Sequence, residues 1–239
     1  MAKSSLSIIL PTYNEREAIC RLIQKILEVV SSMNLNVEII IVDDSSSDGT
    51  AETIKRAFTQ IFPVHLIRRE GPRSLGASIK EGILASKMEF VLVMDANFNH
   101  SPQDIPRLFA CKDRTDFVSG SRFIRGAGVE KRKTRFLGTR FFNFLCRRTL
   151  GLRVVDILNG FLLAKRKNFL ALPLEKIFTG DGDFAIRLHY AIKKKGWSII
   201  EIPVNYSPLR FGVRSKTHFF KYTWRYSLAA LKARFLIKK

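Results

Sequence analysis

Cysteine is scarce in this chain of 239 residues, and the three that it contains have no CxxC spacing. An odd, unpaired set such as Cys20, Cys111 and Cys146 predicts neither a zinc site nor a disulfide framework. Cys20 and Cys146 fall within apolar patterns. We therefore expect them to be buried thiols in a protein of a reducing compartment.

Long apolar runs are also missing. No stretch reaches the about 18 apolar residues that a membrane-spanning helix needs. The first apolar stretch is short and continues directly into a predicted strand, so we expect no cleavable signal peptide. The chain is expected to lie on a bilayer rather than to cross one.

Acidic residues are few compared with basic ones: 21 Asp and Glu against 41 Lys and Arg, for a formal net charge of +20. The excess lies in the second half, with ten basic residues and one acid in Arg122–Arg153, and twelve and one in Lys193–Lys239. Such a charge implies anionic partners: nucleic acid, phosphorylated substrates or an anionic membrane surface. It says nothing about the fold.

Two nucleotide-binding motifs are absent. Neither the G-x-G-x-x-G fingerprint after the first strand nor a P-loop occurs, which disfavours a dinucleotide-binding Rossmann site. Hydrophobic residues nevertheless make up 46% of the chain. That share is enough for a substantial core and argues against disorder.

Strand and helix patterns alternate through residue 121 with short connections, which predicts a mostly parallel sheet with helices on both faces. Residues 154–206 are typical of α+β structure that returns to the sheet. The predicted strands are Ser7–Leu10, Val37–Val42, Val64–Arg68, Phe90–Met94, Phe117–Ser121 and Ile199–Val204; the predicted helices are Glu15–Val30, Ala51–Phe62, Leu75–Ser86 and Pro102–Cys111.

Polar residues follow the apolar run Phe90–Met94 abruptly. Oxygen donors just beyond the carboxyl end of a buried strand lie where open α/β sheets bind ligands. Asp95 and Asn97 could both reach one hard cation such as Mg²⁺ or Mn²⁺. The alternative is that Asp95 only caps the loop before a helix opened by Ser101 and Pro102.

Several motifs, in this order, together resemble the family-2 glycosyltransferases with the GT-A fold, and most closely the polyprenyl-phosphate glycosyltransferases that include dolichol-phosphate mannose synthases. The resemblance covers roughly residues 5–217. It rests on P-T-Y-N-E, D-D-S-S-S-D-G-T, L-G-A-S-I-K-E-G, M-D-A-N-F-N-H, G-S-R and R-F-G-V-R-S-K.

The resemblance implies a nucleotide site at the ends of the first two strands. It assigns the base and ribose to Pro11, Tyr13, Glu15, Val42 and Asp44. A carboxylate can accept hydrogen bonds from ribose hydroxyls, and an aromatic ring can cover a base. Turn capping is the alternative for Asp44 and Asp48. We expect ligand binding for Asp44 and capping for Asp48.

The resemblance also implies a metal and diphosphate motif at Asp95, Ala96, Asn97 and Asn99, with Mg²⁺ or Mn²⁺ as cofactor. The family's usual second carboxylate is replaced by Asn97. An amide oxygen still ligates a hard cation but removes one negative charge. Weaker metal binding, a different preferred metal or loss of activity are the expected consequences.

Three basic residues match positions that face the phosphates in the family: Arg135, Arg210 and Lys216. Arginine suits phosphate because its planar fork makes two aligned hydrogen bonds, and lysine supplies a point charge. The alternative is a solvated basic surface. Asp181 and Asp183 lie near an acidic family segment with different spacing, and the four histidines are expected to be structural or at the surface.

The implied reaction is an inverting transfer of a hexose, with mannose favoured, from GDP-mannose or another nucleotide sugar to dolichyl or polyprenyl phosphate. The GT-A catalytic domain is expected over residues 1–216. Basic amphipathic helices are expected in Lys131–Leu152 and at residues 217–239. They would hold a peripheral enzyme on the cytoplasmic face of a membrane, with or without small anchoring subunits; alternatively, their aromatic residues form an intramolecular core.

Other readings remain open. UDP-glucose could be the donor, and the acceptor could be a protein, a glycan or another lipid. The charge and the interleaved aromatic residues also allow a nucleic-acid-binding protein, but no nucleic-acid-binding signature occurs, and we expect no such partner. Asn97 is the only argument for an inactive scaffold.

Overall fold

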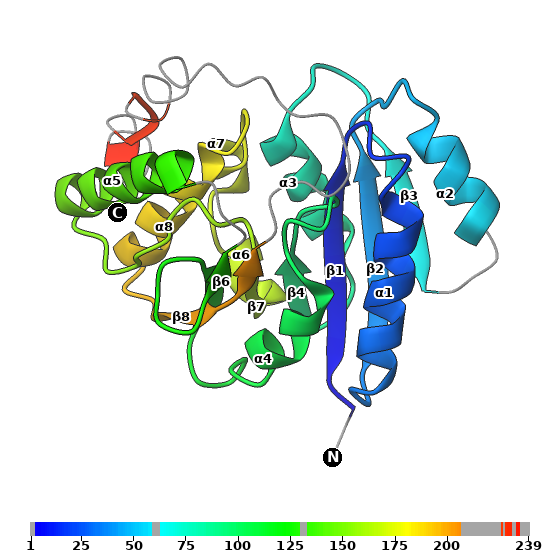
Figure 1. The fold of residues 1–239 in the computed structure, drawn as a ribbon, viewed down its shortest axis with the longest axis horizontal. Coiled ribbons are helices and arrows are strands. Elements are labelled where there is room, and N and C mark those ends of the chain that lie inside the picture. Colours follow the sequence, from blue (N-terminus) through cyan, green and yellow to red (C-terminus); the bar gives the residue numbers. More distant parts are fainter. Residues whose placement is uncertain are drawn as a thin grey trace.

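A seven-stranded sheet forms the centre of the computed structural model, which describes residues 3–58, 63–129, 133–206, 226, 228–230 and 233–234 (Figure 1). The strand order is β3-β2-β1-β4-β7-β5-β8. All neighbours are parallel except β7, which is antiparallel to both β4 and β5. The predicted mostly parallel α/β sheet is confirmed. The antiparallel strand β7 within it was not predicted from the sequence.

The elements alternate in the expected order through β5 and become more irregular afterwards. Their bounds are β1 (Ser5–Thr12), α1 (Ile19–Ser31), β2 (Asn36–Asp43), α2 (Thr50–Phe58), β3 (Val64–Arg68), α3 (Leu75–Ala85), β4 (Phe90–Val93), the 3₁₀ turn η1 (Pro102–Asp104), α4 (Ile105–Phe109), β5 (Phe117–Ser121), β6 (Gly128–Val129), α5 (Lys133–Leu150), β7 (Leu162–Lys165), α6 (Arg166–Leu170), α7 (Leu174–Ile177), α8 (Phe184–Lys194), β8 (Ile199–Pro203) and β9 (Asn205–Tyr206).

The central strands are buried on both faces. Successive side chains of a strand point to opposite faces, so Ile8 and Leu10 enter one core cluster while Ile9 enters the other. All three are fully buried. This is why β1, β2 and β4 read as continuous apolar runs and not as alternating ones.

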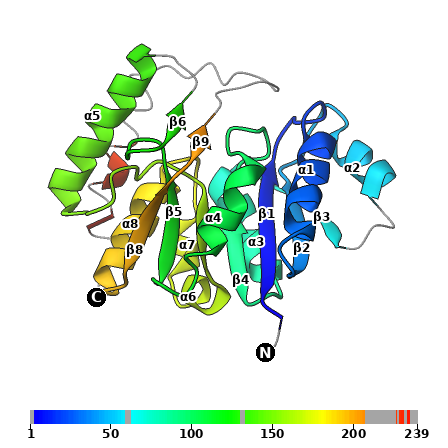
Figure 2. The ribbon, with the colours of Figure 1, turned by 60° about the horizontal axis from the view of Figure 1, so that its bottom comes forward.

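Helices cover each face. α1, α2 and α4 pack on the face of Ile8, whereas α3 and α5 to α8 pack on the face of Ile9. Figures 1 and 2 show α1 and α3 on opposite sides of β1. The carboxyl ends of β1, β2 and β4 lie together at one end of the sheet, because β1 is parallel to both neighbours.

Three predicted boundaries were wrong. The first helix begins at Ile19 and not at Glu15, because the carbonyl of Glu15 closes a turn by accepting from the amides of Ala18 and Ile19. β4 ends at Val93. The helix expected from Pro102 is divided into η1 and the short α4.

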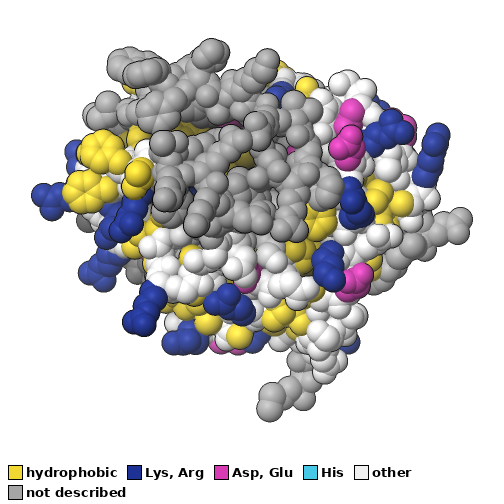
Figure 3. Space-filling view, in the orientation of Figure 1, with side chains coloured by type: hydrophobic (Ala, Val, Ile, Leu, Met, Phe, Trp, Pro, Cys, Tyr) yellow, Lys and Arg dark blue, Asp and Glu magenta, His cyan; other side chains and the backbone are white. Residues whose placement is uncertain are grey.

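The first basic segment forms α5, which buries Asn143, Cys146 and Leu150. Among the side chains of α5 that the structure describes, the exposed large hydrophobic ones are Leu137, Phe141, Phe144 and Leu145. Figure 3 shows hydrophobic side chains bordered by basic ones at the α5 end of the molecule. A membrane-surface role for α5 stays a prediction.

Most of the segment 217–239 lies outside the described residues. Within its described part, Ala229, Ala230 and Ala233 are buried in the core cluster shared with α5 and α8. Arg234 Nη2 donates to the Thr149 carbonyl at 2.6 Å. These residues pack intramolecularly. Within the described ranges, no helix is long and apolar enough to span a bilayer.

Candidate functional site

A tight turn after β4 gathers three of the predicted ligand residues. Asn99 Nδ2 donates to Asp95 Oδ2 at 3.3 Å, and the Asn99 amide donates to Asn97 Oδ1 at 3.2 Å. Phe98 between them has a φ of 62°, a left-handed conformation that is rare for a bulky side chain. The strained turn therefore directs the Asp95, Asn97 and Asn99 side chains toward one another.

His100 contacts this turn through its ring. Its Nδ1 accepts the Asp95 amide at 3.0 Å, and its ring stacks on Phe161 with centroids 4.9 Å apart. Burial lowers the pKa of His100, although the nearby negative charge of Asp95 raises it in part. The ring is therefore neutral near pH 7. His100 is buried, as expected of a structural residue, and its Nε2 lies 4.0 Å from Asp95 Oδ2; its role stays a prediction.

Glu15 lies opposite Asp95 in the loop between β1 and α1. Burial, and then the negative charge of Asp95, raise the pKa of Glu15 to about 7, although a hydrogen bond with Asn97 lowers it in part. Glu15 Oε2 is buried without a hydrogen-bond partner among the described residues. The site thus holds an acceptor that no protein donor in the described ranges satisfies.

Arg122 closes the site on the side of β5. Its Nε and Nη2 each contact the carboxylate of Asp156 at 2.8 Å, and its amide donates to the same carboxylate at 2.9 Å. Although burial alone would lower the pKa of Arg122, the hydrogen bonds with Asp156 raise it. The guanidinium also lies over the Tyr206 ring, 4.9 Å from its centroid.

Sequence reasoning assigned no role to Arg122 or Asp156. The G-S-R motif could have indicated the arginine, but no local signal indicated the aspartate. Glu201 holds Asp156 in place by accepting from the amides of Val155 and Asp156 at 2.7 and 2.9 Å.

A cavity of about 160 Å³ lies between these groups. Its lining contains both polar and apolar side chains. Its lining residues are Pro11, Leu75, Ile79, Val93, Asp95, His100, Arg122, Leu158, Asn159, Gly160, Gly182, Phe184, Ala185 and Tyr206.

The predicted nucleotide residues lie at the same edge of the sheet. Pro11 and Val42 are register partners on β1 and β2. Asp44 follows β2 and is buried, with Oδ1 accepting from Arg69 Nε at 2.8 Å and Oδ2 from the Ser74 amide at 2.7 Å. Both oxygens already hold a partner, so a ligand of Asp44 would use its remaining lone pairs.

Tyr13 is partly covered by Arg73, whose guanidinium carbon lies 3.9 Å from the ring centroid. Asp48 Oδ1 accepts the Thr50 amide at 3.0 Å, which confirms its predicted capping role. The side chain of Ala96 is buried in the core, so only its backbone remains for a ligand.

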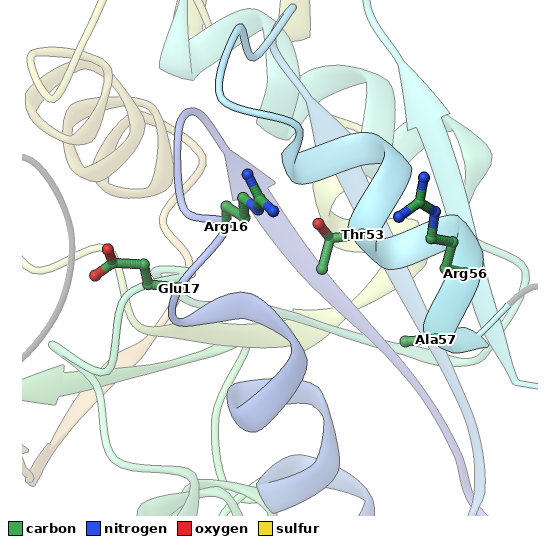
Figure 4. Close-up of a pocket in the computed structure, with 5 residues that line it drawn as sticks. All are labelled: Arg16, Glu17, Thr53, Arg56 and Ala57. Carbon is green, nitrogen blue, oxygen red and sulfur yellow. The ribbon is translucent and has the colours of Figure 1, made fainter.

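A second, larger hollow of about 650 Å³ lies between the start of α1 and α2. Figure 4 shows Arg16 and Arg56 on either side of Thr53, with Glu17 and Ala57 completing the lining. It shares no lining residue with the cavity at Asp95 and contains none of the predicted site residues.

Several predicted residues are not brought to this site by the described structure. Arg210, Lys216 and the side chain of Arg135 lie outside the residues that the structure describes. Asp183 instead pairs with Arg187 Nη1 at 2.6 Å and accepts the Asp181 amide at 3.1 Å.

The donor set at Asp95 fits a hard divalent cation in chemistry. It offers the Asp95 carboxylate, amide oxygens and the unpaired Glu15 Oε2, and Mg²⁺ and Mn²⁺ prefer oxygen ligands. Within the described ranges, no cluster of three or more His, Cys, Asp or Glu side chains forms a metal site. Any metal would therefore rely on amide oxygens in addition to these carboxylates.

This sheet, with acidic groups at the carboxyl ends of its strands, has the GT-A fold. Glucosyl-3-phosphoglycerate synthase from Mycobacterium tuberculosis, solved with Mn²⁺, UDP and glucosyl-3-phosphoglycerate, superposes with a TM-score of 0.71. The match covers 96% of this chain and 80% of that one at 18% identity. The same enzyme with Mg²⁺ and UDP gives a TM-score of 0.70 at 17% identity, over 96% and 79% of the two chains.

The chain belongs to glycosyl transferase family 2, whose model matches residues 7–172. It is 30% identical over 216 residues to a dolichol-phosphate mannosyltransferase of Pyrococcus furiosus, covering 88% of this chain and 57% of that protein. It is 29% identical over 212 residues to a polyprenol monophosphomannose synthase of Mycolicibacterium smegmatis, covering 86% of this chain and 78% of that one. The chain thus spans little more than half of the archaeal relative.

Proposed function

We propose that this chain transfers a hexose, with mannose favoured, from a nucleotide sugar to a dolichyl or polyprenyl phosphate at a membrane surface. The observation that carries the proposal is the grouping of Glu15, Asp95 and Asn97 beside a cavity that also contains Arg122. The names of the two polyprenol-phosphate relatives support the choice of acceptor.

The donor nucleotide would occupy the edge formed by Pro11, Tyr13, Val42 and Asp44, with its diphosphate toward Asp95. The Asp95 carboxylate and the Asn97 and Asn99 amides would hold Mg²⁺ or Mn²⁺, which neutralises charge on the leaving diphosphate. Arg135, Arg210 and Lys216 are proposed to meet the two substrates' phosphates.

A polyprenyl phosphate is already anionic near neutral pH, so it needs little help from a general base. Its oxygen attacks the anomeric carbon as the bond from that carbon to the nucleoside diphosphate breaks, and a single displacement inverts the anomeric centre. The main contributions of the protein are then to position both substrates and to stabilise the leaving diphosphate.

The exposed aromatic residues of α5 are proposed to meet the cytoplasmic face of the membrane. Phe141 and Phe144 are 64% and 52% exposed. Aromatic side chains beside Lys and Arg suit the interface of an anionic bilayer. Small membrane subunits are an additional proposed anchor.

Direct assay of sugar transfer tests the proposal. Purified protein is incubated with a polyprenyl phosphate, Mg²⁺ or Mn²⁺, and GDP-mannose, UDP-glucose or other nucleotide sugars in turn. We expect transfer from GDP-mannose; transfer only from UDP-glucose would support the second donor. Absence of transfer from every donor would support the inactive scaffold instead.

Two substitutions in the turn after β4 sharpen this assay. We expect Asp95→Ala to abolish transfer, because it removes the only carboxylate in that turn. Asn97→Asp adds a second carboxylate, so it should preserve or increase transfer and tighten the apparent affinity for Mn²⁺. Unchanged transfer by Asp95→Ala would refute the site assignment.

A further inference from the structure

The cavity beside Asp95 is small and has little net charge to offer an anion. Pockets for drug-sized ligands span roughly 300–1,000 Å³, so 160 Å³ suits one small group. Its only lining Lys or Arg among the described residues is Arg122, which is already paired with the fully buried Asp156. Among the described lining residues, the charge without an opposite partner is that of Asp95, which is proposed to face the cation, so the rest of the lining suits a neutral polar group better than a second phosphate.

Gly160 determines how much room this cavity has. A Cβ atom added there would lie 3.6 Å from Asp95 Oδ1 and 3.8 Å from His100 Cε1, two groups that line the same space. These are ordinary van der Waals distances, and the backbone of Gly160 does not lie in the left-handed region. The fold would therefore accept a methyl group at this position, but the cavity would lose the space.

Asn159, which lines the cavity, has a buried donor that is not used. Its side chain is 3% exposed, and its Oδ1 accepts the Phe161 amide at 3.0 Å. Its Nδ2 has no hydrogen-bond partner among the described residues. A buried donor without a partner is costly, so a ligand that accepts from it gains affinity and selectivity.

We propose that Asn159 and Gly160 form the subsite for the transferred hexose and help to select it. Sugar hydroxyls both donate and accept, and so match the Asp95 carboxylate together with the Asn159 amide. The carbon face of the ring would pack on apolar side chains of the lining such as Leu158 and Phe184. This inference rests on the proposed function, since it assumes a nucleotide-sugar donor.

Titration calorimetry with two ligands separates the hexose from the nucleotide. GDP and GDP-mannose, each with Mg²⁺, are titrated into wild type, Gly160→Ala and Asn159→Ser; UDP and UDP-glucose are used if GDP does not bind. Ser is neutral and retains an oxygen that can accept a hydrogen bond from the Phe161 amide, but it lacks the Nδ2 donor. Asn36→Ser makes the same change at an exposed position at the opposite end of the sheet and is the control.

We expect Gly160→Ala to weaken the binding of GDP-mannose by about tenfold or more, and Asn159→Ser to weaken it by roughly three- to tenfold. The affinity for GDP should stay within about twofold of the wild-type value. The melting temperature should stay close to that of wild type, and Asn36→Ser should change neither affinity. Equal weakening of both ligands, or no change in either, would overturn the inference.

Two other results have distinct meanings. If only the affinity for a short-chain polyprenyl phosphate falls, then the cavity holds the acceptor phosphate, and the hexose assignment is wrong. If wild type binds neither GDP nor UDP, then the proposed function itself fails and the inference falls with it.

Discussion

Glu15 is a carboxylate placed where its own charge is unfavourable. It is partly buried, faces Asp95, and has an oxygen with no partner among the described residues. Such a group favours its protonated form until a cation or a hydroxyl donor arrives. The free protein therefore holds an unfavourable carboxylate in its site at neutral pH.

We predict that this carboxylate makes stability depend on pH. The pKa of about 7 in the folded state exceeds the ordinary glutamate value of 4.5, so the folded state binds more protons than the unfolded state between pH 4.5 and pH 7. Stability of the wild type should fall as pH rises through that window, and Glu15→Gln should not show this loss. Urea denaturation at pH 4.5 and pH 8 measures the difference.

Glu17→Gln, at an exposed neighbouring position, is the control for that experiment. The stability gain of Glu15→Gln should be small at pH 4.5 and larger at pH 8. An equal gain at both pH values would contradict the assignment to protonation.

The ion pair of Arg122 and Asp156 should make a measurable contribution to the free energy of unfolding. Asp156 is fully buried, and breaking a buried pair by removing one partner costs about 3–5 kcal/mol. Because the Arg122 side chain keeps 14% exposure, we expect Asp156→Asn to lower the free energy of unfolding by a smaller amount, roughly 2–4 kcal/mol. Denaturant unfolding checks this value.

A double-mutant cycle with Arg122→Gln isolates the pair. The two changes should be strongly non-additive, with a coupling of about 1–3 kcal/mol, because each single change leaves the other partner unpaired. Additive effects would show that Asp156 supports the fold by other contacts.

At the scale of elements, α3 connects the two halves of the site. Ser74 caps the helix by accepting the Ala77 amide, and its own amide donates to Asp44. Further along, Leu75 and Ile79 line the cavity. This role requires close packing, since a Cβ on Gly76 would lie 2.7 Å from backbone atoms of Phe178 and Thr179.

We predict that Gly76→Ala destabilises the protein although alanine is the better helix former. Helix propensity would favour alanine by about 1 kcal/mol. The clash is with backbone, which cannot rotate away, and overpacking typically costs about 1–3 kcal/mol. A net loss in the free energy of unfolding is expected, whereas Leu84→Ala, exposed on the same helix, should change it by about 0.5 kcal/mol or less. A stabilised Gly76→Ala variant would show that α3 and the 178–179 segment can separate.

At the scale of the whole molecule, charge is divided between a nearly balanced first half and a basic second half, with a total of +20. The edge of the sheet that is proposed to face the nucleotide comes from the first half. The exposed hydrophobic residues of α5 belong to the second. The second half therefore gives the protein a basic, aromatic surface that is distinct from its site.

We predict that this surface binds anionic vesicles in co-sedimentation, and that binding weakens as salt screens the charges. Replacing Phe141 and Phe144 together by Ser should reduce partitioning by about tenfold or more, because each ring buries apolar area in the interface. Leu84→Ser, exposed on α3, should have little effect. Tight binding to duplex DNA with no binding to vesicles would contradict the membrane proposal.

The local sequence determined much of the fold and part of the site. Apolar runs and helix-period stripes identified β1 to β5 and the helices between them, because those signals lie within neighbouring residues. The same holds for Asp95, Asn97 and Asn99, which are close in the chain and close in space. Their assignment to a metal, and that of Arg135, Arg210 and Lys216 to phosphates, stays a prediction.

Only the tertiary structure decided the rest. The antiparallel insertion of β7 between β4 and β5 depends on strand pairing, which no local pattern specifies. Arg122 and Asp156 are 34 residues apart in the chain, and their contact needs the return of the chain after α5. The pKa of Glu15 likewise depends on burial and on Asp95, which reaches it from the turn after β4. Sequence patterns report neighbours along the chain, whereas the cavity and its electrostatics depend on groups that only folding brings together.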